Sequence, residues 1–378
     1  MTLVRATLRE LFSLPARLRF RRALATRSLA APPGEPALNY GDVLGDGSLV
    51  SGGKVKLLHL VERWPERSPF NILYLVSSAP PPFADELIRW AKRQGAKLVW
   101  NQNGVGFPAW AGWNTYEVNR PLRALRERAD YIVYQSRFCH ESSDHWLGKL
   151  STASQVLYNP VDTAAFRRAE SPPDLRQGFR ILAAGTHYQA FRVIGTLEAA
   201  RELMDAGHRV QITIAGSMRW PDADAEVHAV IDRLRLAEYV TLRPGFTQQE
   251  AVRIYQSAHV LLHLKYQDPC PTVAIEALAC GVPVVATRSG GMPELIGEDG
   301  GETLHVPFDW HSPSYPPSRR IASAVARIMR DWPRRSSAAR ERALRMFDKN
   351  AWVNAHERIF TELLGESAPA SVESPART

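Results

Sequence analysis

One segment of the C-terminal half combines residue types that can bind phosphate groups and sugar hydroxyls. Asp268 and Glu276 are separated by seven residues, across a loop that runs into an expected helix. Pro271 suits the first turn of that helix, because its missing N–H would have no partner within the helix. The amides of Thr272 and Val273, at the positive end of the helix dipole, predict a seat for an anion.

A glycine-rich turn follows the same helix and extends the candidate site. An expected strand at 283–286 opens into Gly290 and Gly291, and Glu294 lies where the next helix starts. Two glycines allow the backbone to approach a ligand closely. A nucleotide diphosphate sugar carries both phosphates and hydroxyls, so the segment predicts a site for such a donor. An ordinary connection between a helix and a strand, with incidental acids, is the alternative.

The elements that must position these residues alternate between short apolar strands and helical patterns. Strands are expected at 70–77, 97–100, 131–134, 180–184, 210–215, 239–242, 260–264 and 283–286. Helices are expected at 84–93, 120–128, 194–204, 226–234, 249–257 and 272–279. This alternation is typical of βαβ units. The expected fold class is therefore α/β, with two Rossmann-like parallel-sheet domains and a ligand-binding cleft at the carboxyl ends of their strands.

Composition and charge limit the class of protein, its compartment and the charge of its partner. Three cysteines in 378 residues, without zinc-ligand spacing, exclude a disulfide framework and argue against a structural zinc site. No run approaches the ~20 apolar residues of a membrane span. Arginines also interrupt the apolar stretches of the first thirty residues, so a cytoplasmic protein is expected. The net charge of +8 falls in the N-terminal part, with 23 Lys and Arg against 15 Asp and Glu up to Glu170, which favours an anionic partner.

Residues 1–35 are expected to form a basic extension whose apolar helical face ends where Pro15 interrupts it. Residues 1–30 are expected either to touch an anionic membrane peripherally or to remain a solvated arm. The other expected limits are 36–170 for an N-terminal acceptor domain, 171–340 for a nucleotide-sugar domain and 365–378 for a disordered tail.

The segment 268–294 resembles the retaining glycosyltransferases of family 4, which have the GT-B fold of two Rossmann-like lobes. The family's hallmark is a Glu-x7-Glu motif, followed by A-x-A-C-G-x-P-V-V-A and G-G-x-P-E. This chain has Asp268 and Glu276 at the motif's acids, ALACGVPVVA at 277–286 and GGMPE at 290–294. Weaker matches are YNPVDT at 158–163, a glycine turn at Gly216 and the loop SGGK at 51–54.

The resemblance implies a role for each matching position. Glu276 would hold the donor ribose hydroxyls, and Asp268, one methylene shorter than the family's glutamate, would bind the transferred sugar. No metal or other cofactor would be required, and residues 341–364 would return to the N lobe as a C-terminal helix. The remaining donor-site positions would be Gly185, Arg192, Gly216, Thr272, Val273, Gly290, Gly291 and Glu294, with Gly52, Gly53 and Lys54 forming the N-lobe loop near the reaction centre.

One departure from the family pattern concerns the charge that meets the diphosphate. The family's G-R-x-x-x-x-K-G turn reads GTHYQAFR at 185–192, so Thr186 and Phe191 replace the arginine and the lysine. Loss of both cations would slow departure of the diphosphate unless another group replaces them. We expect Arg192 to do so, helped by Lys54, with His187 as a weaker candidate; a solvated Arg192 at a helix start is the alternative.

A second departure lies in the N lobe. Asn103 stands where the family often carries a histidine that faces the reacting sugar. An asparagine can hydrogen-bond a hydroxyl but does not act as a base near neutral pH. A polar turn at 101–106 is the alternative. His263 is expected only to pack or cap.

Five aromatic residues cluster after the strand at 97–100. Core packing is the favoured interpretation for this cluster, and stacking on an acceptor sugar is the alternative. The cluster consists of Trp100, Phe107, Trp110, Trp113 and Tyr116.

The sequence thus predicts a retaining, hexosyltransferase-type glycosyltransferase that moves a sugar from a nucleotide diphosphate sugar to a glycan or lipid-linked acceptor. Its proposed catalytic residues are Asp268, Glu276 and Asn103. A non-catalytic binding protein of the same fold and a sugar-nucleotide epimerase are the alternatives. No motif supports a nucleic-acid partner.

Overall fold

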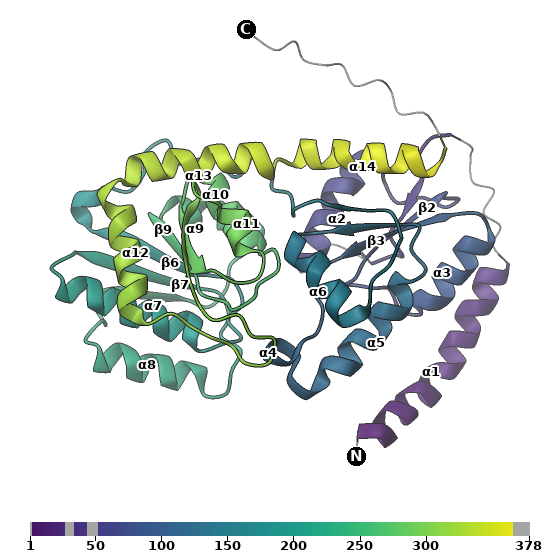
Figure 1. The fold of residues 1–378 in the computed structure, drawn as a ribbon, viewed down its shortest axis with the longest axis horizontal. Coiled ribbons are helices and arrows are strands. Elements are labelled where there is room, and N and C mark those ends of the chain that lie inside the picture. The colour runs from purple at the N-terminus through teal and green to yellow at the C-terminus, as the bar shows by residue number, and fades with distance from the viewer. Residues whose placement is uncertain (1, 27–33, 44–51, 366–378) are drawn as a thin grey trace, which may run out of the picture.

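The computed structural model describes residues 2–26, 34–43 and 52–365. Two lobes, each built on one parallel sheet, lie side by side, with helices covering the sheets (Figure 1). This confirms the architecture expected from the alternation of strands and helices. Apart from Gly365, the expected tail at 365–378 lies outside the described residues.

The N-lobe sheet has five parallel strands in the order β1-β2-β3-β4-β5. Every residue of β2 and β4 is buried, as expected for strands covered on both faces. The sequence predicts the three inner strands but misses the two edge strands, which have only two and three residues. The strands are β1 (Leu38–Asn39), β2 (Ile72–Val76), β3 (Lys97–Gln102), β4 (Tyr131–Tyr134) and β5 (Ser154–Val156).

The C-lobe sheet has six parallel strands in the order β11-β10-β9-β6-β7-β8. In the sheet, β7 and then β8 therefore lie on one side of β6, and β9 lies on the other side of β6. Such a reversal of strand order opens a crevice at the carboxyl ends of the two central strands. The strands are β6 (Phe179–Ala184), β7 (Val210–Ala215), β8 (Val240–Arg243), β9 (Val260–His263), β10 (Val284–Thr287) and β11 (Gly301–Leu304), of which only β11 was not predicted.

The helices fill the connections between these strands. In the N lobe they are α2 (Gly52–Arg63), α3 (Ala84–Arg93), α4 (Pro108–Ala111), η1 (Gly112–Asn114), α5 (Thr115–Arg126) and α6 (Arg137–Leu147). In the linker and the C lobe they are η2 (Leu175–Gln177), α7 (Phe191–Asp205), α8 (Ala223–Arg233), α9 (Gln248–Gln256), α10 (Thr272–Ala279), α11 (Met292–Ile296), α12 (Ser318–Arg330) and α13 (Trp332–Met346). The expected helices α3 and α10 match residue for residue.

The N-terminal extension forms one helix, α1 (Thr2–Ala25), which runs through Pro15. The expected interruption at Pro15 is therefore wrong. A proline inside a helix removes one hydrogen bond and crowds the preceding turn, and here contacts of the second half with α3 offset that cost. Leu24 is buried, Phe20 packs on Phe83 with ring centroids 5.5 Å apart, and Arg21 pairs with Glu86 at 3.2 Å.

The C-terminal helix α14 (Lys349–Leu363) follows α13 and lies over the N lobe beside α2 (Figure 1). Phe360 packs edge-on against Trp64, with ring centroids 5.1 Å apart. His356 shares a buried hydrogen bond of 2.9 Å with the hydroxyl of Tyr74 on β2. The end of the chain thus ties the C lobe to the N-lobe core. In the described part of the chain, no helix is long and apolar enough to cross a membrane.

Candidate active site

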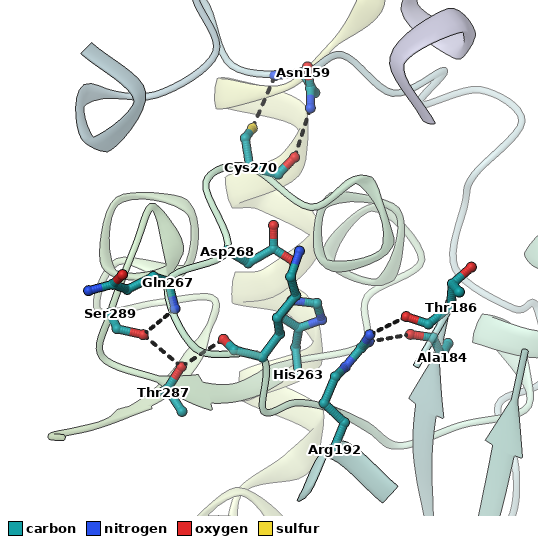
Figure 2. A network of polar contacts seen from close by, with 11 residues as sticks. Asn159, Ala184, Thr186, Arg192, His263, Gln267, Asp268, Cys270, Thr287 and Ser289 are labelled. Carbon is teal, nitrogen blue, oxygen red and sulfur yellow. Dashed lines mark hydrogen bonds and ion pairs between the residues drawn. The ribbon is translucent and has the colours of Figure 1, made fainter. Parts of the chain in front are cut away.

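The candidate site lies at the carboxyl ends of the central C-lobe strands, where the strand order reverses. The turn after β6 begins with Gly185, and the loop after β9 leads through Asp268 to α10. Figure 2 shows Asp268 and Arg192 between these two strand ends. The fold therefore brings together residues that are more than seventy positions apart in the sequence.

Asp268 is held as a carboxylate by two neighbours on the same loop. Its Oδ2 lies 3.0 Å from His263 Nε2 and 3.1 Å from Lys265 Nζ, and the residue is only 8% exposed. Burial alone would raise the pKa of Asp268, but Lys265, His263 and Arg192 outweigh it and hold that pKa well below its usual range. Asp268 is therefore ionised at neutral pH and can accept hydrogen bonds from hydroxyls.

Sequence reasoning missed the part that His263 and Lys265 play at this acid. His263 was expected only to pack or cap, and instead its ring contacts Asp268 at the end of β9 (Figure 2). Burial lowers the pKa of His263, so the ring is neutral and contacts the carboxylate as a hydrogen-bond donor. The spacing His-x-Lys-x-x-Asp directly after a buried strand is a signal from which this grouping could have been predicted.

Glu276 lies on α10, one turn beyond the helix start, and is 7% exposed. Its two carboxylate oxygens accept hydrogen bonds from Gln248 Nε2 at 2.9 Å and from Tyr255 Oη at 2.8 Å. Burial raises the pKa of Glu276, and these two neutral donors lower it. Each oxygen keeps a lone pair that can accept a further hydrogen bond.

The start of α10 faces the turn after β6. Thr272 and Val273 are its first two residues and both are partly exposed. A Cβ atom placed on Gly185 would lie 3.4 Å from Val273 Cγ1, so the two segments are in contact. The amides of the first helical turn have no acceptor within the helix, which leaves them available to a bound anion.

The glycines of the site bring loops of the protein together. A Cβ on Gly216 would lie 2.0 Å from the carbonyl oxygen of Gly185, and one on Gly291 would lie 1.9 Å from that of Pro269. A Cβ on Gly290, at φ +61°, would lie 2.5 Å from the carbonyl oxygen of Asp268, and the N–H of Gly291 donates to that carbonyl at 2.9 Å. Both glycines thus allow a close approach to the loop that carries the acid, and their contact with a ligand stays a prediction.

Arg192 is a buried residue of the first turn of α7 and is not a solvated side chain. It is 5% exposed, and its Nη atoms donate to the carbonyl oxygens of Thr186 and Ala184, the latter at 3.0 Å (Figure 2). Burial lowers the pKa of Arg192 and Asp268 raises it, and an arginine remains charged under such conditions. The guanidinium therefore supports the turn after β6 and places a positive charge beneath it.

Two further residues of this segment, Phe191 at the family's lysine position and the weaker candidate His187, do not supply charge. Phe191 stacks on Tyr315, with ring centroids 4.2 Å apart. His187 is fully buried, and burial together with Arg192 lowers its pKa to about 3, so its ring is neutral at physiological pH. The expectation that His187 could act as a cation is wrong, because desolvation disfavours the charged imidazolium.

Replacing Arg192 with methionine is expected to weaken binding of a nucleoside diphosphate by roughly ten-fold, because the site loses a buried positive charge. Arg192→Lys keeps the charge and should retain part of the affinity. Calorimetric titration with nucleoside diphosphates measures the effect, and Arg201→Met, farther along α7 on a partly exposed side chain, is the control. Unchanged affinity in Arg192→Met would mean that other groups meet the phosphate charge.

Glu294, on α11 of the C lobe, contacts the N lobe. Its carboxylate accepts hydrogen bonds from the N–H groups of Arg137 and Phe138, each at 2.9 Å, and from Tyr158 Oη at 3.0 Å. The carboxylate thus caps the start of α6, together with the Ser136 side chain. These contacts give Glu294 a structural role, and its donor-binding role stays a prediction, because a carboxylate with three protein donors can still accept a further hydrogen bond.

Removal of that cap should reduce the stability of the protein more than it reduces the affinity for the donor. Glu294→Ala is expected to lower the free energy of unfolding by about 1–2 kcal/mol, the usual cost of losing a helix N-cap. Urea denaturation measures this value, and Glu298→Ala, on the exposed loop that follows α11, is the matched control. A variant with unchanged stability but lost affinity for a nucleoside diphosphate would support the donor-binding role of Glu294.

The N-lobe side of the site is the turn after β3. Asn103 N donates to Ser77 Oγ at 2.8 Å, and its side-chain Nδ2 donates to Ser78 Oγ at 2.5 Å. A Cβ on the next residue, Gly104, would lie 3.4 Å from Pro269 Cγ, so this turn reaches the C-lobe acid loop. Asn103 therefore lies at the interface of the lobes, next to the residue that approaches the loop of Asp268.

The glycine loop expected at 51–54 is, from Gly52 onward, the first turn of helix α2. Gly52 and Gly53 form the first turn of α2, whereas Ser51 and the side chain of Lys54 lie outside the described residues. The buried lysine of this helix is Lys56, whose Nζ lies 2.6 Å from Asn103 Oδ1. Sequence reasoning missed Lys56, because a lysine in an apolar helical pattern is usually a surface residue.

The aromatic cluster after β3 is divided between core and surface. Trp100 and Phe107 are buried, and Phe107 packs against Trp310 of the C lobe with ring centroids 5.2 Å apart. Core packing is the wrong expectation for the three others, because α4, η1 and α5 turn them outward. Those exposed residues are Trp110, Trp113 and Tyr116, at 55%, 80% and 63% exposure.

Two parallel-sheet lobes that meet at such a site define the GT-B class of fold. Residues 178–331 match the family model described as Glycosyl transferases group 1. This match covers less than half of the chain and lies in the C-terminal lobe, and it confirms the resemblance to the family 4 glycosyltransferases there.

Several known glycosyltransferases are similar to parts of this chain, and the number of matched residues differs among them. The D-inositol 3-phosphate glycosyltransferase of Paenarthrobacter aurescens (strain TC1) is 34% identical over 175 residues, which are 43% of this chain and 42% of that protein. The chain thus spans less than half the length of this curated relative, and from about a fifth to a half of others.

Solved structures extend the likeness to both lobes. Anabaena HepE, in complex with UDP and glucose, has a TM-score of 0.67 at 15% identity, covering 86% of this chain and all of that one. A glycosyltransferase of Rickettsia africae ESF-5 has a TM-score of 0.63 at 17% identity, covering 85% and 84%. At this level of identity the likeness is one of fold, and it confirms the GT-B fold.

Proposed function

We propose that this protein transfers a hexose-type sugar from a nucleotide diphosphate sugar to a glycan or lipid-linked acceptor, with retention of anomeric configuration. The observation that carries the proposal is Asp268, a buried carboxylate held ionised by His263 and Lys265 beside the start of α10. An ionised acid suits sugar hydroxyls, and a helix start suits phosphates. A nucleotide sugar presents these groups next to each other.

The proposed reaction needs charge stabilisation at the leaving group. The bond from the anomeric carbon to the β-phosphate oxygen breaks, and the acceptor oxygen forms its bond on the same face. The acceptor proton passes to the leaving phosphate oxygen, so no base on the protein is needed and Asn103 is compatible with activity. Negative charge develops on the diphosphate, where the Thr272 and Val273 amides and the nearby Arg192 charge would stabilise it.

Glu276 is the proposed ligand of the donor ribose. Its oxygens are fixed by Gln248 and Tyr255, and each can accept one further hydrogen bond. UDP is the first nucleotide to test, because the similar HepE structure contains it. The protein groups named here meet the diphosphate charge in the proposed complex, so we propose that no metal is required.

The decisive experiment is a thermal-shift screen over nucleotide diphosphate sugars, followed by product analysis. A ligand that binds only the folded state stabilises it by about 2.7 kcal/mol at a hundred times its Kd. We expect one donor class to raise Tm, and the product formed with acceptor to keep the donor's anomeric configuration by NMR. Turnover should persist in EDTA. An inverted product would refute retention, and loss of turnover in EDTA would refute the metal-free proposal.

A non-catalytic nucleotide-sugar-binding protein is the second candidate. The observation that favours it is the engagement of both Arg192 Nη atoms by backbone carbonyls, with Thr186 at the expected arginine position. Tight binding of UDP-sugars by calorimetry, with no hydrolysis or transfer under any acceptor, would establish it.

We also propose that the protein is cytoplasmic and meets anionic membranes through residues 1–30. Support comes from the charge of this segment and from Leu14 and Leu18 on α1, which are 49% and 47% exposed. Co-sedimentation with vesicles rich in anionic lipid should succeed with the full chain and weaken when Leu14 and Leu18 are replaced by serine. Equal binding to neutral vesicles would contradict the electrostatic part of the proposal.

A further inference from the structure

Lys56 is a buried lysine whose ammonium is surrounded by asparagine side chains. Its Nζ lies 2.6 Å from Asn101 Oδ1, 2.6 Å from Asn103 Oδ1 and 3.3 Å from Asn159 Oδ1. Lys56 is 3% exposed. An ammonium has three N–H donors, and these three amide oxygens can take all of them. The three asparagines come from β3, the turn after it and the linker between the lobes.

The charge of Lys56 has no acidic partner in the described part of the chain, where no carboxylate forms an ion pair with it. The titratable groups that face this cluster are Cys139 on α6, Cys270 before α10, His356 on α14 and Tyr74 on β2. Burial raises the pKa of the two thiols and the phenol and lowers that of the imidazole, so all four are neutral near pH 7. An unpaired buried cation costs free energy, which indicates a role beyond packing.

The ammonium fixes the orientation of the Asn103 amide. Lys56 donates to Oδ1, whereas Ser78 Oγ accepts from Nδ2. If the oxygen and the nitrogen exchanged places, the amide N–H groups would face the ammonium, which has no acceptor, and the bond to Lys56 would be lost. A positive charge on Oδ1 also polarises the amide and strengthens its N–H groups as donors. An amide nitrogen carries two N–H groups, and Ser78 takes one, which leaves the other for a ligand.

The same ammonium is connected to the C-lobe acid loop. Asn159 accepts from Lys56 with Oδ1 and donates with Nδ2 to the carbonyl oxygen of Cys270 at 2.7 Å. Cys270 is two residues from Asp268, and Figure 2 shows Asn159 above this loop. One charge thus contacts the N-lobe turn that carries Asn103 and the linker residue that holds the loop of Asp268.

We propose that Lys56 is a positioning residue, whose ammonium aligns Asn103 with the sugar held at Asp268 and fixes both to one geometry through Asn159. The inference rests on the proposed function, since it assigns Asn103 to the transferred sugar. It differs from a packing role because it requires the charge of Lys56, which deprotonation removes.

The pH dependence follows from the environment of Lys56. Burial lowers its pKa to about 8, from an ordinary value of 10.5. As pH rises through about 8, Lys56 loses its charge in the folded protein, and its hold on the Asn103 oxygen weakens. The neighbouring thiols, phenol and imidazole do not titrate in this interval. Alignment should therefore decline in alkaline solution.

The test that needs no substrate is NMR of the Asn103 side-chain amide in protein labelled with ¹⁵N-asparagine, assigned by its absence in Asn103→Gln. We expect this resonance to shift with a midpoint near pH 8 in the natural chain and not to shift in Lys56→Met. An Asn103 amide that stays constant from about pH 6.5 to 9.5 in the natural chain would overturn the proposal by itself, even if Lys56→Met fails to fold.

The kinetic test uses the donor identified by the thermal-shift screen. Lys56→Met should lower kcat by roughly 10–100-fold, as misalignment of reacting groups does, with the KM for donor within about two-fold. Lys56→Arg keeps a charge at high pH, so its residual rate should not fall above pH 8. Lys92→Met, on α3, is the matched control. Normal kcat in a folded Lys56→Met would refute the inference, whereas a titrating amide in a protein that turns over no donor would refute the proposed function instead.

Discussion

Asp268→Asn is expected to lower the transfer rate by roughly 10²–10³-fold, the usual effect of removing one preorganised electrostatic group. The amide has nearly the shape of the carboxylate, but it lacks the charge and one of the acceptors that would meet the sugar hydroxyls. Single-turnover measurement with saturating donor separates this effect from donor binding. The decline of the transfer rate above about pH 8 that we assign to Lys56 should remain in Asp268→Asn, since Lys56 belongs to another cluster.

The same substitution should also destabilise the fold, with a defined pH dependence. The pKa of Asp268 is lowered in the folded state, so its contribution to stability is present above the unfolded value near 3.9 and is lost as pH falls through the folded value. Asp268→Asn leaves Lys265 and Arg192 without a nearby counter-charge. We expect a loss of roughly 3 kcal/mol in the free energy of unfolding at pH 7, which should shrink on acidification below pH 4.

Two control variants separate charge from position at this acid. Asp268→Glu restores the residue of the family pattern and keeps the charge, so it should be more stable and more active than Asp268→Asn. Asp224→Asn, in the first turn of α8, should leave both properties unchanged. An Asp268→Asn protein with a near-normal rate would remove Asp268 from the catalytic site.

Glu276→Gln is expected to abolish measurable transfer while leaving the protein at least as stable as the natural chain. A charge-assisted hydrogen bond is worth about 1.5–3 kcal/mol. Loss of two such bonds to the ribose would lower kcat/KM by on the order of 10²–10⁴-fold. The decrease should appear mainly in donor affinity, and calorimetry with UDP measures it directly.

We expect Glu276→Gln to be at least as stable as the natural chain because the pKa of Glu276 is raised in the folded state. Burial raises the pKa of Glu276 above its ordinary value, and its partners Gln248 and Tyr255 are neutral. The carboxylate therefore destabilises the folded state as pH rises through that raised pKa. A glutamine avoids this cost and still offers Tyr255 an acceptor, so Tm at pH 7 should not fall.

Loss of activity without loss of stability is the signature of a residue kept for function. Glu238→Gln, on an exposed loop after α8, is the control for handling and expression. A Glu276→Gln protein that transfers sugar at a normal rate would contradict the donor-site assignment, and one that is strongly destabilised would indicate a structural role for Glu276.

The strands and the C-terminal motif could be predicted because their signals are local. Runs such as 131–134 match β4 residue for residue, since a strand covered on both faces is apolar along its whole length. The spacing of Asp268, Pro271 and Glu276 likewise fixes a loop and a helix start. The short edge strands β1 and β5 could not be predicted, because they bury too little to impose a pattern.

Several site residues depended on contacts between distant segments. His263 and Lys265 hold Asp268 only because the loop after β9 folds back on the strand end. The cap that Glu294 provides could not be predicted, because its partners lie 136 to 157 positions away. Helix α1 continues through Pro15 for a similar reason, since Phe20 and Leu24 find a partner surface on the N lobe.

By itself, the sequence determined the two α/β lobes, the parallel sheets and the segment that we propose as the donor site, because periodicity and short motifs act within a few residues. Tertiary structure alone decided the charge state of Asp268, the turn that Arg192 supports, and the cluster of Lys56 with Asn103. These properties depend on burial and on the distances between side chains, and both are set only when segments distant in the sequence pack together.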